Sequence, residues 1–251
     1  MIYDEFECVG ENRWEPAIPP SIIAQSNHRV LSLSRFLNVY APQSEEWYRE
    51  RSARVTASAV GEILNCGYHD FQNPQPAYLQ SESLMLEKSG FVEPFAGSDA
   101  TRFGQALEPE ARAHYAQFAK EHLAKFGLLV HYQYWFIGAS PDAVGLSSGR
   151  LVEIKCPKSR TVKEGGIIPP HYCFQMWLQQ ECCNADECCY YEYRVMKRPP
   201  EIRTNAVVVH RSQEWFQTVL PLFQQYIIHL YRLKALASLF KPKWSSAKKR
   251  S

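Results

Sequence analysis

One stretch of the sequence, residues 138–160, constrains the fold of this chain more than any other. An apolar run at 134–137 leads into it, a turn rich in glycine and serine occupies 145–149, and a second apolar run returns at 151–156. Two apolar runs joined by such a turn predict a β-hairpin. We expect the rest of the chain to be arranged around this hairpin.

Three charged side chains lie on the predicted hairpin. Because side chains alternate along a strand, Glu153 and Lys155 share one face. Their neighbours Val152 and Ile154 point into the core, and Asp142 precedes the turn. Two carboxylates that can hold a hard divalent cation, with a lysine one strand period away, are typical of metal-assisted phosphodiester hydrolysis. The pattern predicts a nuclease core, whereas the three charges alone would also fit an ordinary exposed, ion-paired hairpin.

Composition limits the class of protein. A chain of 251 residues with 45% apolar residues can bury a proper core, and a net charge of +2 excludes a polycationic surface, so any nucleic-acid contact must come from local basic patches. The sequence has no run of 18 apolar residues and no signal-like leader. Eight cysteines without a leader favour buried thiols in a reducing compartment. We expect an intracellular protein, cytoplasmic or nuclear, with no membrane contact.

The chain divides into four parts. Proline-rich residues 1–44 are expected to form an N-terminal extension, 45–211 the nuclease core, 212–240 a C-terminal helical segment and 241–251 a basic tail. The tail is interpreted either as a solvated segment or as one that contacts nucleic acid or directs nuclear targeting. Pro221 predicts a kink in the C-terminal segment, or its division into two helices.

The local patterns predict an α/β fold: a central mixed sheet of about four to five strands flanked by helices, with helical extensions at both ends. Ser44 and Ser98 are expected to cap helices, Thr56 or Ser58 to cap a further one, and Pro109 to kink or divide the helix that follows Ser98. The remaining expected elements are a loop at 65–79, helices at 83–88 and 172–183, and strands at 128–137, 151–156, 188–195 and 205–210.

An ordered set of motifs resembles a known family. The set consists of Gly104-Gln105-Ala106-Leu107-Glu108, Ser140-Pro141-Asp142, Glu153-Ile154-Lys155-Cys156-Pro157, a later helix with Gln175, and an early Arg54-Val55-Thr56-Ala57-Ser58. It is similar to the YqaJ-like viral recombinase family, the family of phage lambda exonuclease, within the restriction-endonuclease-like PD-(D/E)XK superfamily. The resemblance covers about residues 47–195. Two departures are Ala143, where a glycine is usual, and Trp177, where a second glutamine is common.

The resemblance implies the site residues. Asp142, Glu153 and the Ile154 carbonyl would be metal ligands, with Glu108 serving the metal directly or through water. Lys155 would orient the attacking water or stabilise charge on the phosphate, and Gln175 would help to hold the water and the metal site. The positions that match the family's 5′-phosphate ligands are Arg51, Ser58, Ser140 and Arg160, with Lys158 competing for the last place.

The resemblance also implies the activity: a Mg²⁺-dependent 5′-to-3′ exonuclease on double-stranded DNA, acting in recombination or repair, with Mn²⁺ able to substitute. A ring-shaped homotrimer and a single-strand annealing partner belong to the same expectation. Two alternatives stay open, an endonuclease of the same superfamily acting on DNA or RNA, and an inactive DNA-binding protein. The complete carboxylate and lysine set argues against the inactive form, because clustered unpaired carboxylates are costly without a cation.

Two further groups have competing interpretations. The doublets Cys182-Cys183 and Cys188-Cys189 could bind zinc, but adjacent pairs lack the C-x-x-C spacing, which favours buried thiols. Tyr132, Tyr134 and Trp135 could stack on bases, but aromatic residues in a predicted strand are more often part of the core.

Overall fold

The structure is a computed structural model that describes residues 40, 42–64, 82–94, 97–162, 165–197 and 200–240. Nearly all of the expected N-terminal extension, the loop at 65–79 and the basic tail at 241–251 lie outside these residues. What the structure describes is a mixed α/β fold with a five-stranded and a three-stranded sheet, flanked by helices. The predicted fold class is therefore confirmed.

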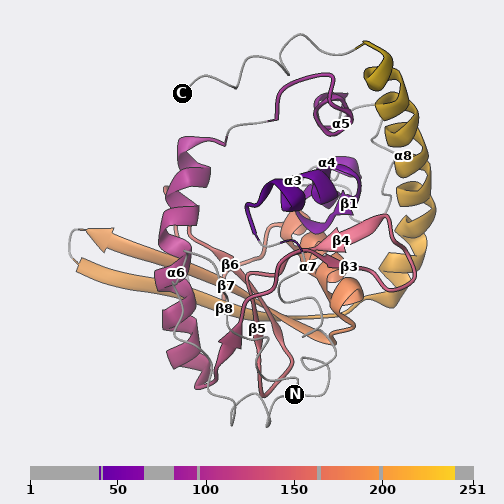
Figure 1. Cartoon of the computed structure of the whole chain (residues 1–251). Helices are drawn as coiled ribbons and strands as arrows, with labels where there is room; N and C mark the ends of the chain where they lie inside the picture. Colours follow the sequence, from indigo (N-terminus) through magenta and orange to yellow (C-terminus); the bar gives the residue numbers. More distant parts are fainter. Residues whose placement is uncertain are drawn as a thin grey trace, which may run out of the picture.

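The second strand of the predicted hairpin is the central strand of the five-stranded sheet (Figure 1). Its order is β2-β5-β6-β7-β8, and only the β6–β7 pair is parallel, so the sheet is mixed as expected. Strand β6 lies in the middle, which leaves no free edge beside its charged residues. The strands are β2 (Leu123–Ala124), β5 (Ala143–Gly145), β6 (Leu151–Lys155), β7 (Glu187–Lys197) and β8 (Pro200–His210).

The hairpin has a different first arm from the one predicted. Strand β5 pairs with β6, and the aromatic run at 134–137 does not. That run instead ends in β4 (Ile137–Ala139), which pairs with β3 (Leu129–Val130) and, in parallel, with β1 (Val55–Thr56). The single strand expected at 128–137 is therefore two short strands joined by a turn, and these belong to the second sheet.

The helices begin largely where the capping signals place them. Ser44 accepts a hydrogen bond from the Trp47 N–H at the start of α3 (Glu45–Ser52), and Ser98 accepts one from the Thr101 N–H at the start of α6 (Asp99–Ala119). No side-chain cap forms at Thr56, which precedes the 3₁₀ turn η3 (Ala57–Ala59), so that expectation is wrong. The other helices are α4 (Val60–Ile63), α5 (Glu82–Ser89), α7 (Pro170–Cys183) and α8 (Gln213–Phe240).

Two prolines lie inside continuous helices. Pro109 does not divide α6, and Pro221 does not divide α8, contrary to one of the expectations for each. A proline leaves the carbonyl four residues earlier without its helical partner. Both prolines and the residues at those carbonyls, Gln105 and Gln217, are exposed, so water can bind the freed oxygens. None of the described helices is long and apolar enough to cross a membrane.

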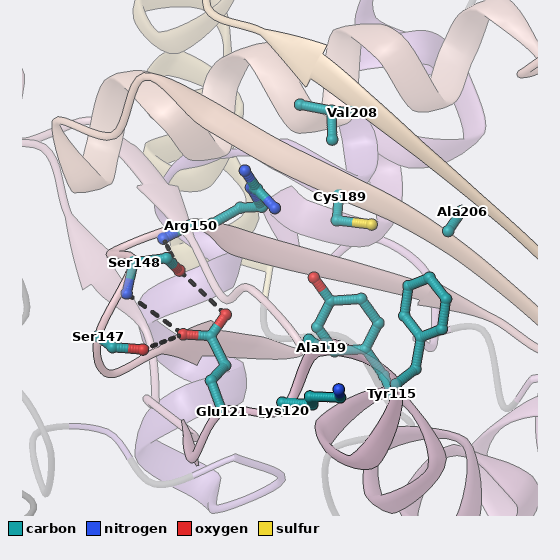
Figure 2. Close-up of a pocket in the computed structure, with 11 residues that line it drawn as sticks. Tyr115, Ala119, Lys120, Glu121, Ser147, Ser148, Arg150, Cys189, Ala206 and Val208 are labelled. Carbon is teal, nitrogen blue, oxygen red and sulfur yellow. Dashed lines mark hydrogen bonds between the residues drawn. The ribbon is translucent and has the colours of Figure 1, made fainter.

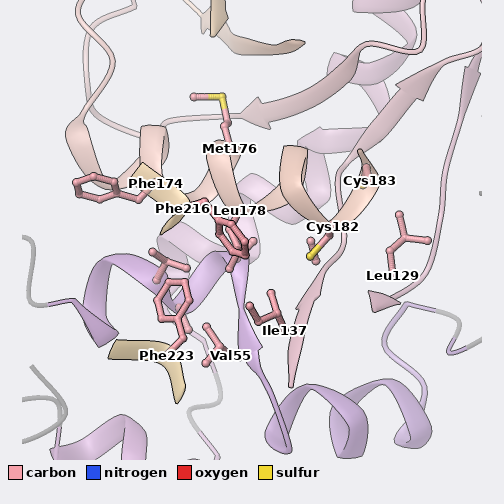
Figure 3. Packing of buried hydrophobic residues seen from close by; sticks show 14 of the residues in the cluster. Val55, Leu129, Ile137, Phe174, Met176, Leu178, Cys182, Cys183, Phe216 and Phe223 are labelled. Carbon is pink, nitrogen blue, oxygen red and sulfur yellow. The ribbon is translucent and has the colours of Figure 1, made fainter. Parts of the chain in front are cut away.

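Both faces of the five-stranded sheet are covered around β6. Helix α6 packs Ala111 and Tyr115 against Val152 and Ile154 on one face. On the other face, Leu151 belongs to the larger core formed with α7, α8 and the three-stranded sheet (Figure 3). Figure 1 shows α6 and α7 on opposite sides of β6. The expected burial of Val152 and Ile154 is confirmed, but the charged face of β6 is buried as well.

Candidate active site

The sheet and its preceding loop bring the two predicted carboxylates together. Asp142 stands directly before β5, and its Oδ2 accepts a hydrogen bond from the Ile154 N–H at 2.7 Å. Glu153 lies in the middle of β6 and is only 1% exposed. The turn at 146–150 therefore folds the Asp142 carboxylate back onto the strand that carries Glu153.

Three donors hold the buried Glu153 carboxylate. Lys155 forms an ion pair with Oε1, Gln175 donates to Oε1 at 2.7 Å, and Gln179 donates to Oε2 at 2.6 Å. Gln175 and Gln179 are one helical turn apart on α7, so both amides face β6. Gln179 was not among the predicted site residues; its i, i+4 spacing from Gln175 is the signal in the sequence that indicates it.

The site has a strongly negative potential around one lysine. Burial, followed by the charges of Glu153 and Glu108, raises the pKa of Asp142 well above its ordinary range. Burial also disfavours a charged Lys155, but Glu153 and Asp142 outweigh it and raise the pKa of the ammonium. Burial and then Glu108 and Asp142 raise the pKa of the Cys156 thiol to about 12. The two carboxylates therefore favour the charged form of Lys155.

Glu108 lies at the edge of this cluster and is held by two cations. Its Oε1 accepts from Arg112 at 2.5 Å, one helical turn further along α6, and lies 3.5 Å from Lys125 Nζ. Its charge contributes to the raised pKa of Asp142. Glu108 thus acts on the cluster electrostatically while its carboxylate is bound by Arg112 and Lys125.

The donor set suits a hard divalent cation. The half-buried Asp142 and the buried Glu153 provide carboxylate oxygens whose negative charges repel each other, and Ile154 provides a carbonyl between them. Within the part of the chain that the structure describes, no group of three or more His, Cys, Asp or Glu side chains is close enough to form a complete metal centre. Asp142 and Glu153 are thus the two carboxylates that could bind the cation. Glu108 could become a third acidic ligand only by leaving Arg112.

Three of the four predicted phosphate ligands lie in one contact network. Arg51 donates to the Ser58 hydroxyl at 2.7 Å and places its guanidinium 4.2 Å from the Trp47 ring centroid. The Trp47 indole N–H donates to the Ser140 hydroxyl at 3.2 Å. Burial lowers the pKa of Arg51 to about 10. Ser140 is two residues before Asp142, so this network adjoins the carboxylates.

Arg160 is held elsewhere. It forms an ion pair with the buried Glu192 and donates to the Tyr190 hydroxyl at 3.2 Å. Burial first, and then the positive charges of Lys155 and Arg160, lower the pKa of His171. Because Lys155 and Arg160 both act on His171, Arg160 lies near the Lys155 end of the site. Its side-chain partners are Glu192 and Tyr190, not Arg51 or Ser58. The competing residue Lys158 is exposed.

A cavity of about 400 Å³ lies between the C-terminal part of α6 and strands β7 and β8 (Figure 2). None of the candidate catalytic residues lines it. Tyr115, Arg150 and Cys189 line it, and Glu121 at its rim accepts hydrogen bonds from Ser147 and Ser148. These bonds hold the turn between β5 and β6. The cavity therefore lies beside the turn between β5 and β6 and is separate from the Asp142 and Glu153 carboxylates.

The other two sequence interpretations have different outcomes. Both cysteine doublets are free, buried thiols, as expected. Cys188 and Cys189 point into opposite cores because neighbouring strand residues alternate. The core interpretation is wrong for Tyr132, 70% exposed, and for Trp135, 54% exposed, because both lie in the turn between β3 and β4.

Fold and site together define a class of protein. A mixed sheet whose central strand carries Glu153 and Lys155, with Asp142 on the preceding arm, is a restriction-endonuclease-like nuclease fold. The sequence model of the YqaJ-like viral recombinase domain matches residues 46–185, more than half of the chain. The chain belongs to the YqaJ-like viral recombinase family.

One curated viral protein is similar to this chain in sequence. The uncharacterized protein R354 of Acanthamoeba polyphaga mimivirus is 26% identical over 196 residues, which are 70% of this chain and 34% of that protein. This chain thus spans about a third of the length of that curated relative.

Solved exonucleases share the fold. The alkaline exonuclease LHK-Exo from Laribacter hongkongensis superposes with a TM-score of 0.61 at 24% identity, over 79% of this chain and 98% of that one. Its complex with dAMP gives a TM-score of 0.62 at 23% identity over the same shares. A phage related exonuclease from Haemophilus somnus 129PT gives 0.54 at 13% identity, over 74% and 96%.

Proposed function

We propose that this chain is a divalent-metal-dependent deoxyribonuclease, a 5′-to-3′ exonuclease on double-stranded DNA that acts in recombination or repair. The observation that carries the proposal is the buried Glu153 and the half-buried Asp142 beside Lys155, whose charged form both carboxylates favour. Lys155 balances only one of these two negative charges, so a bound metal cation would be favoured. Family membership and the exonuclease fold support the same conclusion.

The residues have separate roles in the proposed reaction. Asp142, Glu153 and the Ile154 carbonyl would hold Mg²⁺ or Mn²⁺, which supplies charge neutralisation and a more acidic bound water. Lys155 places a fixed positive charge where the phosphate gains negative charge. Gln175 and Gln179 keep the Glu153 carboxylate in one orientation. Glu108 adds negative potential that favours cation binding.

The proposed polarity depends on a terminal phosphate site. Arg51, Ser58 and Ser140 offer a guanidinium and two hydroxyls on the side of Asp142 where a DNA end would enter. A terminal phosphate carries a second charge that an internal diester lacks, so these donors would prefer an end. We include Arg160 as a ligand that would have to leave Glu192. The homotrimer and the annealing partner stay predictions.

A linear duplex labelled separately at each end tests the proposal. Digestion with Mg²⁺ should release label from the 5′ end first, and omission of Mg²⁺ should abolish release. Asp142→Ala and Glu153→Ala should be inactive while folded, because each removes a cation ligand. Rapid cutting of covalently closed circular DNA would instead establish an endonuclease. A fully active Glu153→Ala variant would rule out the assigned site, and a folded wild type inactive on every DNA and RNA substrate would favour the binding protein.

A further inference from the structure

A buried lysine outside the predicted site binds the segment that carries Arg51. Lys88, near the end of α5, is 8% exposed, and its Nζ donates to the carbonyl oxygens of Arg51 at 2.7 Å and Arg54 at 3.0 Å. Both carbonyls lie at or just beyond the C-terminal end of α3. A cation at this position also interacts favourably with the helix dipole. Lys88 therefore fixes the backbone from which the Arg51 side chain extends.

Arg51 is consequently held at both ends. Lys88 binds its carbonyl, while Ser58 and the Trp47 ring fix its guanidinium. An arginine fixed in this way loses little conformational entropy when it binds a phosphate. Without the Lys88 ammonium, the end of α3 would be less tightly held and the Arg51 guanidinium would be less well positioned.

The lysine also belongs to a cluster of like charge. Lys234 of α8 donates to the Ser52 hydroxyl at 3.2 Å, so three cations, Arg51, Lys88 and Lys234, surround the end of α3. Burial, and then Arg51 and Lys234, lower the pKa of Lys88 to about 7, against the opposing charges of Glu87 and Glu62. A bound anion near this cluster would favour the charged form of Lys88, because it would offset the repulsion from Arg51 and Lys234.

We propose that Lys88 is a positioning residue for a terminal 5′ phosphomonoester, acting through the Arg51 and Arg54 carbonyls to set the Arg51 guanidinium. This inference rests on the proposed exonuclease function, because it assigns Lys88 to the end-binding part of the same site. Lys88 itself does not touch the phosphate in this assignment, since its ammonium is bound to the two carbonyls.

The test compares blunt duplexes with 5′-phosphate and 5′-hydroxyl ends on wild type, Lys88→Met and the control Lys120→Met, which changes an exposed lysine at the end of α6. Lys88→Met should raise KM for the phosphorylated duplex about tenfold with kcat unchanged, and should leave the hydroxyl duplex nearly unaffected. Metal-free binding, followed by fluorescence anisotropy, should show the same selective loss. Lys120→Met should match wild type on both duplexes.

The outcomes separate this inference from the proposed function. Equal losses on both duplexes would show that Lys88 only supports the fold and would overturn the inference. If Lys88→Met does not fold, Lys88→Gln replaces it: the glutamine side chain is one atom shorter and uncharged, so it weakens the contacts with the two carbonyls, and an unchanged preference for phosphorylated ends in that variant overturns the inference too. An active wild type with no preference between the ends would remove the phosphate site but leave the nuclease. Without any nuclease activity, the binding comparison still tests Lys88.

Discussion

Lys155 and Glu153 illustrate how a single ion pair can prepare a site. The Lys155 ammonium and the Gln175 amide share one oxygen of Glu153, and Gln179 takes the other. A cation that binds Oε1 of Glu153 must therefore displace Lys155 or Gln175, because each carboxylate oxygen accepts about two hydrogen bonds. Lys155 is the donor best suited to turn toward a phosphate, because a substrate would supply negative charge in exchange for the carboxylate.

Replacement of Lys155 by methionine tests this role. Lys155→Met should lower kcat by two to three orders of magnitude, because a preorganised charge at the reacting phosphate contributes about 3 to 4 kcal/mol. Binding of duplex DNA without metal should change little. Single-turnover kinetics and anisotropy measure the two quantities. Parallel losses in binding and turnover would make Lys155 a docking residue.

The raised pKa of Asp142 predicts a pH-dependent metal requirement. Because burial, Glu153 and Glu108 raise this pKa, the metal-free carboxyl keeps its proton at pH values where an ordinary aspartate is ionised. Cation binding must release that proton, so the Mg²⁺ concentration for half-maximal activity should fall as pH rises. Titrations with Mg²⁺ at several pH values measure it, and a constant requirement would contradict the prediction.

Much of the acidic cluster could be predicted from individual residues, but its burial could not. Asp142, Glu153 and Lys155 do meet, because alternation on a strand is a local property, and Gln175, which only the family resemblance indicated, joins them from α7. Alternation also suggested one polar face for β6. Helix α7 covers that face, and no local pattern indicates this contact. The role of Gln179, which binds the buried Glu153 carboxylate from α7, was therefore not predicted.

At the scale of elements, β5 shows the limit of local patterns. Its residues Ala143, Val144 and Gly145 are small and give a weaker strand signal than the aromatic run at 134–137. The parallel pairing of β4 with β1 joins residues some 80 positions apart in sequence. No local pattern specifies such a pair, whereas Ser44 and Ser98 specify helix starts by themselves.

The turn between β5 and β6 provides a test at this scale. A Cβ on Gly145 would lie 2.5 Å from the Glu121 carboxylate, which accepts three hydrogen bonds from Ser147 and Ser148. Gly145→Ala should therefore displace that carboxylate and lower the free energy of unfolding by about 1–2 kcal/mol. Chemical denaturation measures the change.

Two controls sharpen this test. In the Glu121→Ala background, Gly145→Ala should cost much less, because the displaced group is gone. Gly104→Ala, inside α6, places a Cβ at an ordinary 3.7 Å from the Cys156 carbonyl and should not destabilise the protein. Additive losses from Gly145→Ala and Glu121→Ala would show that the two residues are independent.

At the scale of the whole molecule, two partly buried clusters of opposite charge lie close together. The acidic cluster around Asp142 and the basic cluster around Arg51 are joined through Ser140, which contacts Trp47 and precedes Asp142 by two residues. Each cluster favours a ligand of the opposite sign. A metal and a terminal phosphate would thus relieve both at neighbouring points.

Metal removal should nevertheless leave the fold intact. Glu153 has three protein donors and Asp142 has the Ile154 N–H, so neither carboxylate depends on a cation for hydrogen bonds. Excess chelator should leave Tm unchanged, whereas Mg²⁺ at about a hundred times its Kd should stabilise the protein by about 2.7 kcal/mol. Calorimetry measures both. A large fall in Tm with chelator would indicate a structural metal.

The position of β6 also determines how often each part of the proposed site opens to solvent. Strand β6 is paired on both sides and covered on both faces, so its amides should exchange with deuterium only when the whole domain unfolds. Helix α3, which carries Arg51, has no buried residue and should exchange through local opening. Exchange followed by mass spectrometry should therefore find peptides from 45–52 labelled long before those from 151–155. Local opening of α3 would then interrupt the placement of Arg51 by Lys88 from time to time, while the strand that carries Glu153 and Lys155 stays closed.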